Sequence, residues 1–90
     1  MALTAVTIKI MPVSPEVDIS KIKESAEAII KKIGGIPHKS EEQPIAFGLK
    51  ALILIIGWPE SKDPDAIEKE LSKIKNVNSV EITDVRRAFG

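Results

Sequence analysis

The chain has 90 residues, with 13 basic and 13 acidic side chains, so its formal net charge is zero. This balance provides no global attraction to nucleic acid or to an anionic membrane. Cysteine is absent, which excludes disulfides, thiolate metal sites and a cysteine nucleophile. There is no signal peptide and no transmembrane run, which favours the cytoplasm. The length is that of one small domain, expected to span residues 1–90.

The first half of the chain predicts a strand, a helix and an edge strand. Residues 3–11 alternate between apolar and polar, which is typical of a half-buried strand. Asp18 is a candidate cap for the helix, and Gly34-Gly35 should end it because glycine adopts the left-handed conformation without penalty. Residues 36–43 are polar and predict a short edge strand. The apolar stripe of the helix consists of Ile19, Ile22, Ala26, Ile29, Ile30 and Ile33.

The second half begins with the most apolar segment of the chain. Residues 51–56 are all apolar and lie in a central strand expected from about Phe47 to Trp58. Pro44 suits the entry to that strand, and Gly48 permits a bulge or a close backbone approach. The run is too short to span a membrane.

A second helix and a last strand follow. Asp63-Pro64 is a helix start, with Asp as cap and Pro in the first turn. We expect Asn76 to end this helix, residues 77–85 to form the last strand, and residues 86–90 to form a short tail. The buried stripe of the helix should consist of Ala66, Ile67, Leu71 and Ile74.

The order β-α-β-β-α-β predicts the fold class. Two amphipathic helices need one sheet face to cover them, and each crossover should be right-handed. We therefore expect an α+β, ferredoxin-like two-layer sandwich, with a four-stranded antiparallel sheet and both helices on one face.

Candidate catalytic and metal-binding residues are few. We interpret His38 as a solvated surface histidine, because it lacks a serine or cysteine partner in a motif and lacks companion metal ligands. The carboxylates Glu41-Glu42 and those of Glu16 and Asp18 are interpreted as solubilising. Trp58 is expected at the edge of the core. We predict a protein that is not an enzyme and that has no metal or cofactor.

Phe47 is the residue with two competing interpretations. It is one of three aromatic residues in the chain, and it lies where a loop meets the central strand. At that place it is either a probe for a partner or a plug for the end of the core.

Two motifs stand out, PIAFGLK at positions 44–50 and EITDVRR at positions 81–87. Together they resemble the archaeal translation elongation factor 1-beta family. The opening VTIKIMP at positions 6–12 resembles the same family, so the likeness covers essentially the whole chain. The proline, aromatic-glycine and lysine pattern is also similar to the C-terminal exchange domain of the eukaryotic beta subunit.

The resemblance implies a translation elongation factor that promotes exchange of GDP for GTP on the GTPase elongation factor 1-alpha. In the family the aromatic of the aromatic-glycine pair contacts the GTPase, and here that residue is Phe47. The eukaryotic version also uses a lysine near its C-terminus to disturb the magnesium site, whereas the tail of this chain, RRAFG, contains none. The expected partner-binding residues are Phe47, Gly48, Lys50, Arg86 and Arg87.

A second hypothesis is a ferredoxin-like regulatory or oligomerisation module that binds a small ligand between subunits. If Leu52, Leu54 and Ile56 face the helices, Ile53 and Ile55 face outward from a central strand, and such a patch needs an explanation. A mixing test with the purified GTPase separates the two hypotheses.

Overall fold

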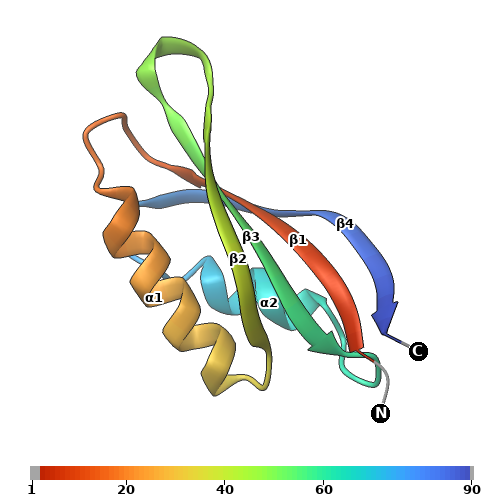
Figure 1. Ribbon diagram of the computed structural model, residues 1–90. Coiled ribbons are helices and arrows are strands. Elements are labelled where there is room, and N and C mark those ends of the chain that lie inside the picture. Colours follow the sequence, from red (N-terminus) through yellow and green to blue (C-terminus); the bar gives the residue numbers. More distant parts are fainter. Residues whose placement is uncertain (1–2, 90) are drawn as a thin grey trace.

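The computed structural model describes residues 3–89, and the side chains of residues 3–87. The elements follow the predicted order β-α-β-β-α-β (Figure 1). They are β1 (Leu3–Pro12), α1 (Ile19–Lys32), β2 (Ile36–Pro44), β3 (Lys50–Pro59), α2 (Asp65–Leu71) and β4 (Val77–Phe89), with a short 3-10 turn at Ala46–Gly48 between β2 and β3.

The strands form one antiparallel sheet in the order β2-β3-β1-β4. Both helices lie on the same face of this sheet, and the other face is left uncovered (Figure 1). The predicted ferredoxin-like two-layer sandwich is therefore confirmed. None of the helices in residues 3–89 is long and apolar enough to cross a membrane.

The core lies between the helices and the two central strands. Val6 pairs with Ile56, Ile8 with Leu54 and Ile10 with Leu52, and all six side chains are buried. Successive side chains of a strand point to opposite faces, so these residues form one apolar layer facing the helices. The helices contribute the buried Ile19, Ile22, Ala26, Ile30, Ile67 and Leu71.

Both ends of α1 are closed as the sequence predicts. The Asp18 carboxylate Oδ1 accepts a hydrogen bond from the Ser20 backbone N–H at 2.9 Å, which satisfies one of the free donors of the first turn. At the other end Gly34 has φ +99°. The Gly34 and Gly35 N–H groups donate to the carbonyls of Lys31 and Ile30, which is the Schellman arrangement.

The second helix differs from the prediction. The Asp63 carboxylate accepts a hydrogen bond from the Asp65 N–H, as expected for a cap. The helix ends at Leu71, not near Asn76. Ser72 Oγ donates to the carbonyl of Glu68, and irregular turns follow. The buried stripe is accordingly shorter: Ala66 is exposed, and Ile74 lies beyond the helix.

Strand β4 is longer than predicted. The segment expected to be a tail continues the strand, since Arg86 pairs with Ala5 and Arg87 with Thr4. Without this pairing the outer edge of β1 would keep unpaired backbone groups. Three register shifts interrupt the pairing of β4 with β1. Such irregularities twist an exposed edge and discourage further pairing.

Strand β3 starts at Lys50, so the prediction that it begins near Phe47 was wrong. At its other end Trp58 is 1% exposed and belongs to the core cluster, so it is more deeply buried than the edge position expected for it. The Trp58 Nε1–H donates to the carbonyl of Lys62 at 3.2 Å, and the Lys62 Nζ donates to the carbonyl of Ile33 at 2.7 Å. The loop after β3 is thereby tied to the end of α1.

Truncating the layer between helices and sheet should destabilise the fold. Ile22→Ala and Leu71→Ala each remove a buried side chain, at 3% and 0% exposure, and each should lower the free energy of unfolding by about 2–5 kcal/mol. Denaturant titration measures the change, with the exposed Lys31→Ala as control. Unchanged midpoints for both core variants would contradict the packing described above.

Candidate functional site

The turn between β2 and β3 extends beyond the rest of the sheet at one end of the molecule (Figure 1). Pro44 and Lys50 pair at its base. Above them the Ile45 N–H donates to the carbonyl of Leu49 at 2.7 Å, and the Leu49 N–H donates to the carbonyl of Ala46 at 3.3 Å. Two backbone hydrogen bonds therefore close a tight turn around Phe47.

Phe47 has an uncommon backbone conformation, with φ 62° and ψ 32°. This is the left-handed region, which costs a residue other than glycine roughly 1–2 kcal/mol. The side chain is 94% exposed, so the interpretation of Phe47 as a core plug is wrong. The exposed side chain makes no core contacts that would compensate for the backbone strain. Strained backbone of this kind is concentrated at binding and active sites.

Gly48 continues the same conformation, with φ +78°. A Cβ added there would meet nothing closer than Pro15 Cβ at 3.9 Å. The need for glycine at this position is therefore one of backbone conformation and not of space. Lys50 is exposed and lines a hollow of about 190 Å³ with Glu42 and Pro15, between the turn and the β1–α1 loop.

The two arginines lie on opposite faces of β4. Arg86 pairs with Ala5, while Arg87 pairs with Thr4, and neighbouring residues of a strand alternate between faces. The Arg86 Nε lies 2.7 Å from Asp84 Oδ2. Arg87 forms an ion pair with Glu60 in the loop after β3. Only one of the two guanidinium groups is thus on the uncovered face.

The structure does not bring the expected partner-binding residues together. Phe47, Gly48 and Lys50 lie at the turn, whereas the arginines lie beside Ala5, which pairs with Gly57 at the far end of β3. The seven-residue advance from Lys50 to Gly57 is roughly 23 Å at the rise of a strand. The molecule is elongated, with a long dimension of 41 Å, and these residues occupy its two ends.

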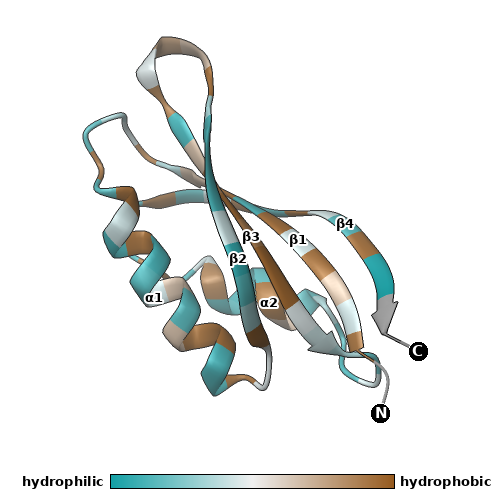
Figure 2. Ribbon diagram, in the orientation of Figure 1, coloured by the Kyte–Doolittle hydropathy of each residue, from teal (hydrophilic) through white to brown (hydrophobic). Residues whose placement is uncertain are grey.

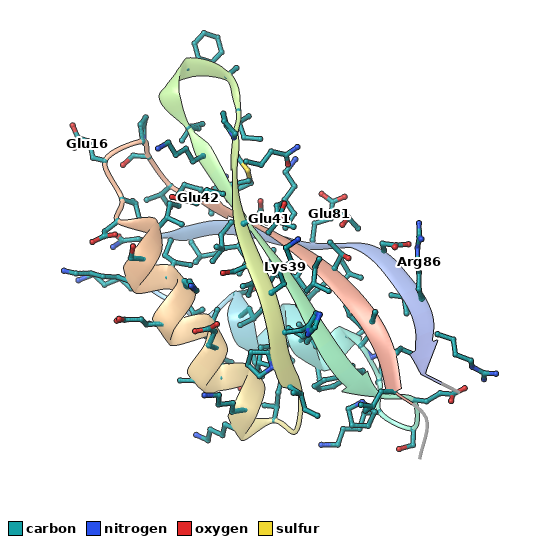
Figure 3. The ribbon with its side chains drawn as sticks, viewed as in Figure 1. Glu16, Lys39, Glu41, Glu42, Glu81 and Arg86 are labelled. Carbon is teal, nitrogen blue, oxygen red and sulfur yellow. The ribbon has the colours of Figure 1, made fainter. Side chains whose placement is uncertain are left out.

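The remaining candidates are dispersed over the surface. His38 is exposed, as predicted. Glu16 lies on the loop before α1 and Glu42 on β2 (Figure 3). Within residues 3–89 no three or more His, Asp or Glu side chains are grouped closely enough to hold a metal ion, and no charged or polar side chain of the described part is classed as buried.

The described structure is thus a small α+β sandwich with a strained, exposed aromatic residue at one end and two arginines at the other. The family profile of the EF-1 guanine nucleotide exchange domain matches residues 5–88. The chain belongs to this family, and its role is the exchange of GDP for GTP in translation elongation.

Individual relatives are similar over nearly the whole chain. Elongation factor 1-beta of Methanothermobacter thermautotrophicus is 43% identical over 82 residues, which cover 90% of this chain and 91% of the relative. The protein of the same name from Methanobrevibacter smithii is 42% identical, with 97% and 98% covered. That of Methanocaldococcus jannaschii is 37% identical, with 98% and 100% covered.

Two features of the site were missed by the sequence analysis. Gly48 could have indicated a turn with positive φ at this position, because glycine adopts positive φ in turns without steric cost. Which of the two arginines lies on the uncovered face depends on the register shifts between β4 and β1, and the sequence contains no signal for them.

The backbone strain at Phe47 should be measurable as a change in the free energy of unfolding. Phe47→Gly removes the left-handed penalty and loses no core contact, so its free energy of unfolding should equal that of the wild type or exceed it by up to about 1 kcal/mol. Gly48→Ala should instead destabilise by roughly 1 kcal/mol. Denaturant titration compares both variants with the wild type, and a loss of several kcal/mol in Phe47→Gly would contradict this account of the turn.

Proposed function

We propose that this chain accelerates nucleotide release from the GTPase elongation factor 1-alpha by binding it with both ends. The observation that carries the proposal is Phe47, which is 94% exposed on a strained, hydrogen-bonded turn. Aromatic side chains that enter a pocket of a partner dominate the free energy of many interfaces. A turn fixed before binding also lowers the ordering cost of association.

Exchange requires binding and no bond chemistry. A GTPase holds its nucleotide through phosphate and magnesium contacts. If this chain binds the nucleotide-free form more tightly, it weakens nucleotide binding, and the nucleotide weakens its binding by the same factor. The chain is then an exchange factor and not an enzyme that makes or breaks bonds.

The second contact is made by the arginine end. Arg86 and Arg87 are held on a strand and have largely exposed side chains, at 79% and 68%. Guanidinium groups bind phosphate oxygens in a bidentate manner, so this end suits the phosphate and magnesium region of the GTPase. Gly48 and Lys50 support the contact at the other end, Gly48 through the backbone and Lys50 through its charge.

The family match favours this function over a regulatory or oligomerisation module with a small ligand. The proposed exchange domain spans residues 1–90 as a single unit. It acts in the cytoplasm, where translation elongation takes place, and it needs neither direct contact with nucleic acid nor a membrane.

Removing the aromatic should separate activity from stability. Phe47→Ala should keep the melting temperature within a few degrees of the wild type, because the side chain is outside the core. Losing about 2 kcal/mol of interface free energy should slow exchange roughly thirtyfold at subsaturating factor. Release of a fluorescent guanine nucleotide from elongation factor 1-alpha measures the rate, and Phe47→Leu should retain part of it. A large drop in melting temperature with normal release would exclude the proposed contact.

The arginine end should also affect exchange more than stability. Exposed ion pairs contribute about 0–1 kcal/mol each, so Arg86→Ala with Arg87→Ala should melt nearly as the wild type. If the pair contributes about 1.4 kcal/mol to binding, exchange slows about tenfold. The matched control is Lys31→Ala with Lys32→Ala, which removes the same charge from the exposed end of α1. Wild-type exchange by the arginine variant would remove this end from the mechanism.

A further inference from the structure

The uncovered face of the sheet contains an apolar groove near the arginine end. It has a volume of about 470 Å³. Gly57 lies at its floor, where an added Cβ would be 3.7 Å from both Ile36 Cβ and Leu3 Cδ1. The absence of a side chain at Gly57 and the small side chain of Ala5 leave the space open. The groove is lined by Leu3, Ala5, Ile36, His38, Ile55 and Gly57, with Lys39 at its margin.

The shape of the groove depends on an irregularity in β2. Pro37 pairs with Ile56 and Lys39 pairs with Ile55, which leaves His38 without a partner in the ladder. A bulge of this kind bends the edge strand and redirects its side chains. Beside it Ile36 is 56% exposed, although it is a large apolar residue on an edge strand.

Nothing in residues 3–89 covers this face. The helices occupy the opposite face, and β3 is the most continuously apolar strand of the sheet (Figure 2). Thr7 and Lys9 of β1 also lie on the open face, so its apolar part is the groove beside Ala5, Ile36, Ile55 and Gly57. A contiguous exposed apolar region on a small protein is typical of an interaction surface.

The position of the groove identifies its occupant. Ala5 forms part of the groove and pairs with Arg86, so the groove is continuous with the arginine end of the proposed interface. Phe47 follows β2 and precedes β3, and both strands line the groove. A partner that contacts both ends while lying over this sheet must cross the open face.

The area needed for binding leads to the same conclusion. A specific interface of ordinary size buries about 800 Å² on each partner, which is a substantial part of the 5655 Å² surface of this chain. The turn and the arginine end lie at opposite ends of a molecule 41 Å long. An interface that reaches both ends on this side of the sheet extends over the open face between them.

The margins of the face have the character of an interface rim. Lys39 and Glu41 form an ion pair on β2 at 3.0 Å, and Arg86 and Asp84 form one on β4. Lys39, Glu41, Glu81 and Arg86 lie along the two sides of this surface in Figure 3. Lys9 of the central strand β1, which pairs with Ile53 and Glu81, adds a charge to the same face. An apolar groove surrounded by charged groups of both signs is compatible with the usual anatomy of a protein interface.

We infer that the groove on the open face is a third contact surface for elongation factor 1-alpha and receives an apolar segment of that protein. This inference rests on the proposed function. The partner segment is apolar at its centre and carries polar or charged residues on both sides, to match the rim formed by β2 and β4.

The test uses the complete chain and purified elongation factor 1-alpha. Ile36→Glu introduces a charge at a largely exposed edge position, and Ile55→Thr makes the open face polar while it keeps a β-branched residue in the strand. Each should raise the factor concentration for half-maximal nucleotide release about tenfold or more, with a melting temperature close to that of the wild type. Ala28→Glu should behave as the wild type, because it places a new charge on the exposed side of α1, outside the groove.

The outcomes distinguish this inference from the proposed function. If the wild type does not accelerate release at all, the proposed function fails. If the wild type is active and Phe47→Ala is defective, but Ile36→Glu and Ile55→Thr keep wild-type half-maximal concentrations, only the groove contact is overturned. Sedimentation of the free chain is measured alongside. A dimer that Ile36→Glu converts to monomer without any change in exchange would assign the groove to a second copy and also overturn the inference.

Discussion

The molecule depends on the register of β3 against β1. Because Ile8 is opposite Leu54 and Ile10 opposite Leu52, every large side chain on one face of both central strands enters the core under the helices. A shift of one residue would turn these side chains to solvent. The same register fixes which face stays uncovered, with Ile53 and Ile55 on it. The core and the proposed binding face are thus the two sides of one strand pairing.

Much of the fold could be predicted because the residues on the buried face of a helix or strand recur at a regular spacing in the sequence. The spacing of Ile22, Ala26 and Ile30 and the alternation around Leu54 each indicate one buried face, and Asp18 and Gly34 form caps by local chemistry that the sequence displays. The extension of β4 through Arg86 and Arg87 could not be predicted in this way. That segment pairs through its backbone, which needs no apolar pattern, and its side chains remain in solvent.

The geometry of the candidate site could not be predicted from the sequence, although the motif that contains its residues is visible there. The motif around Phe47 was visible, but its exposure depends on a turn that closes below it through Ile45 and Leu49. The faces of Arg86 and Arg87 depend on the register of an irregular edge strand. The groove was anticipated only as outward-facing Ile53 and Ile55. Its depth comes from residues far apart in the chain, above all Gly57 and Ile36, and no single segment contains that information.

If the chain binds its partner through both ends, as proposed, the distance between these ends has a kinetic consequence. Two contacts on one rigid sheet do not act as independent binders, because once one has formed, the other is held near its target at a high effective concentration. Each contact can therefore be weak and reversible while the pair binds well. Release can proceed one end at a time, through a partly attached state in which returning nucleotide competes with a single weak contact. In a compact interface of equal total affinity, all contacts would have to dissociate together, so the factor would dissociate from its partner more slowly.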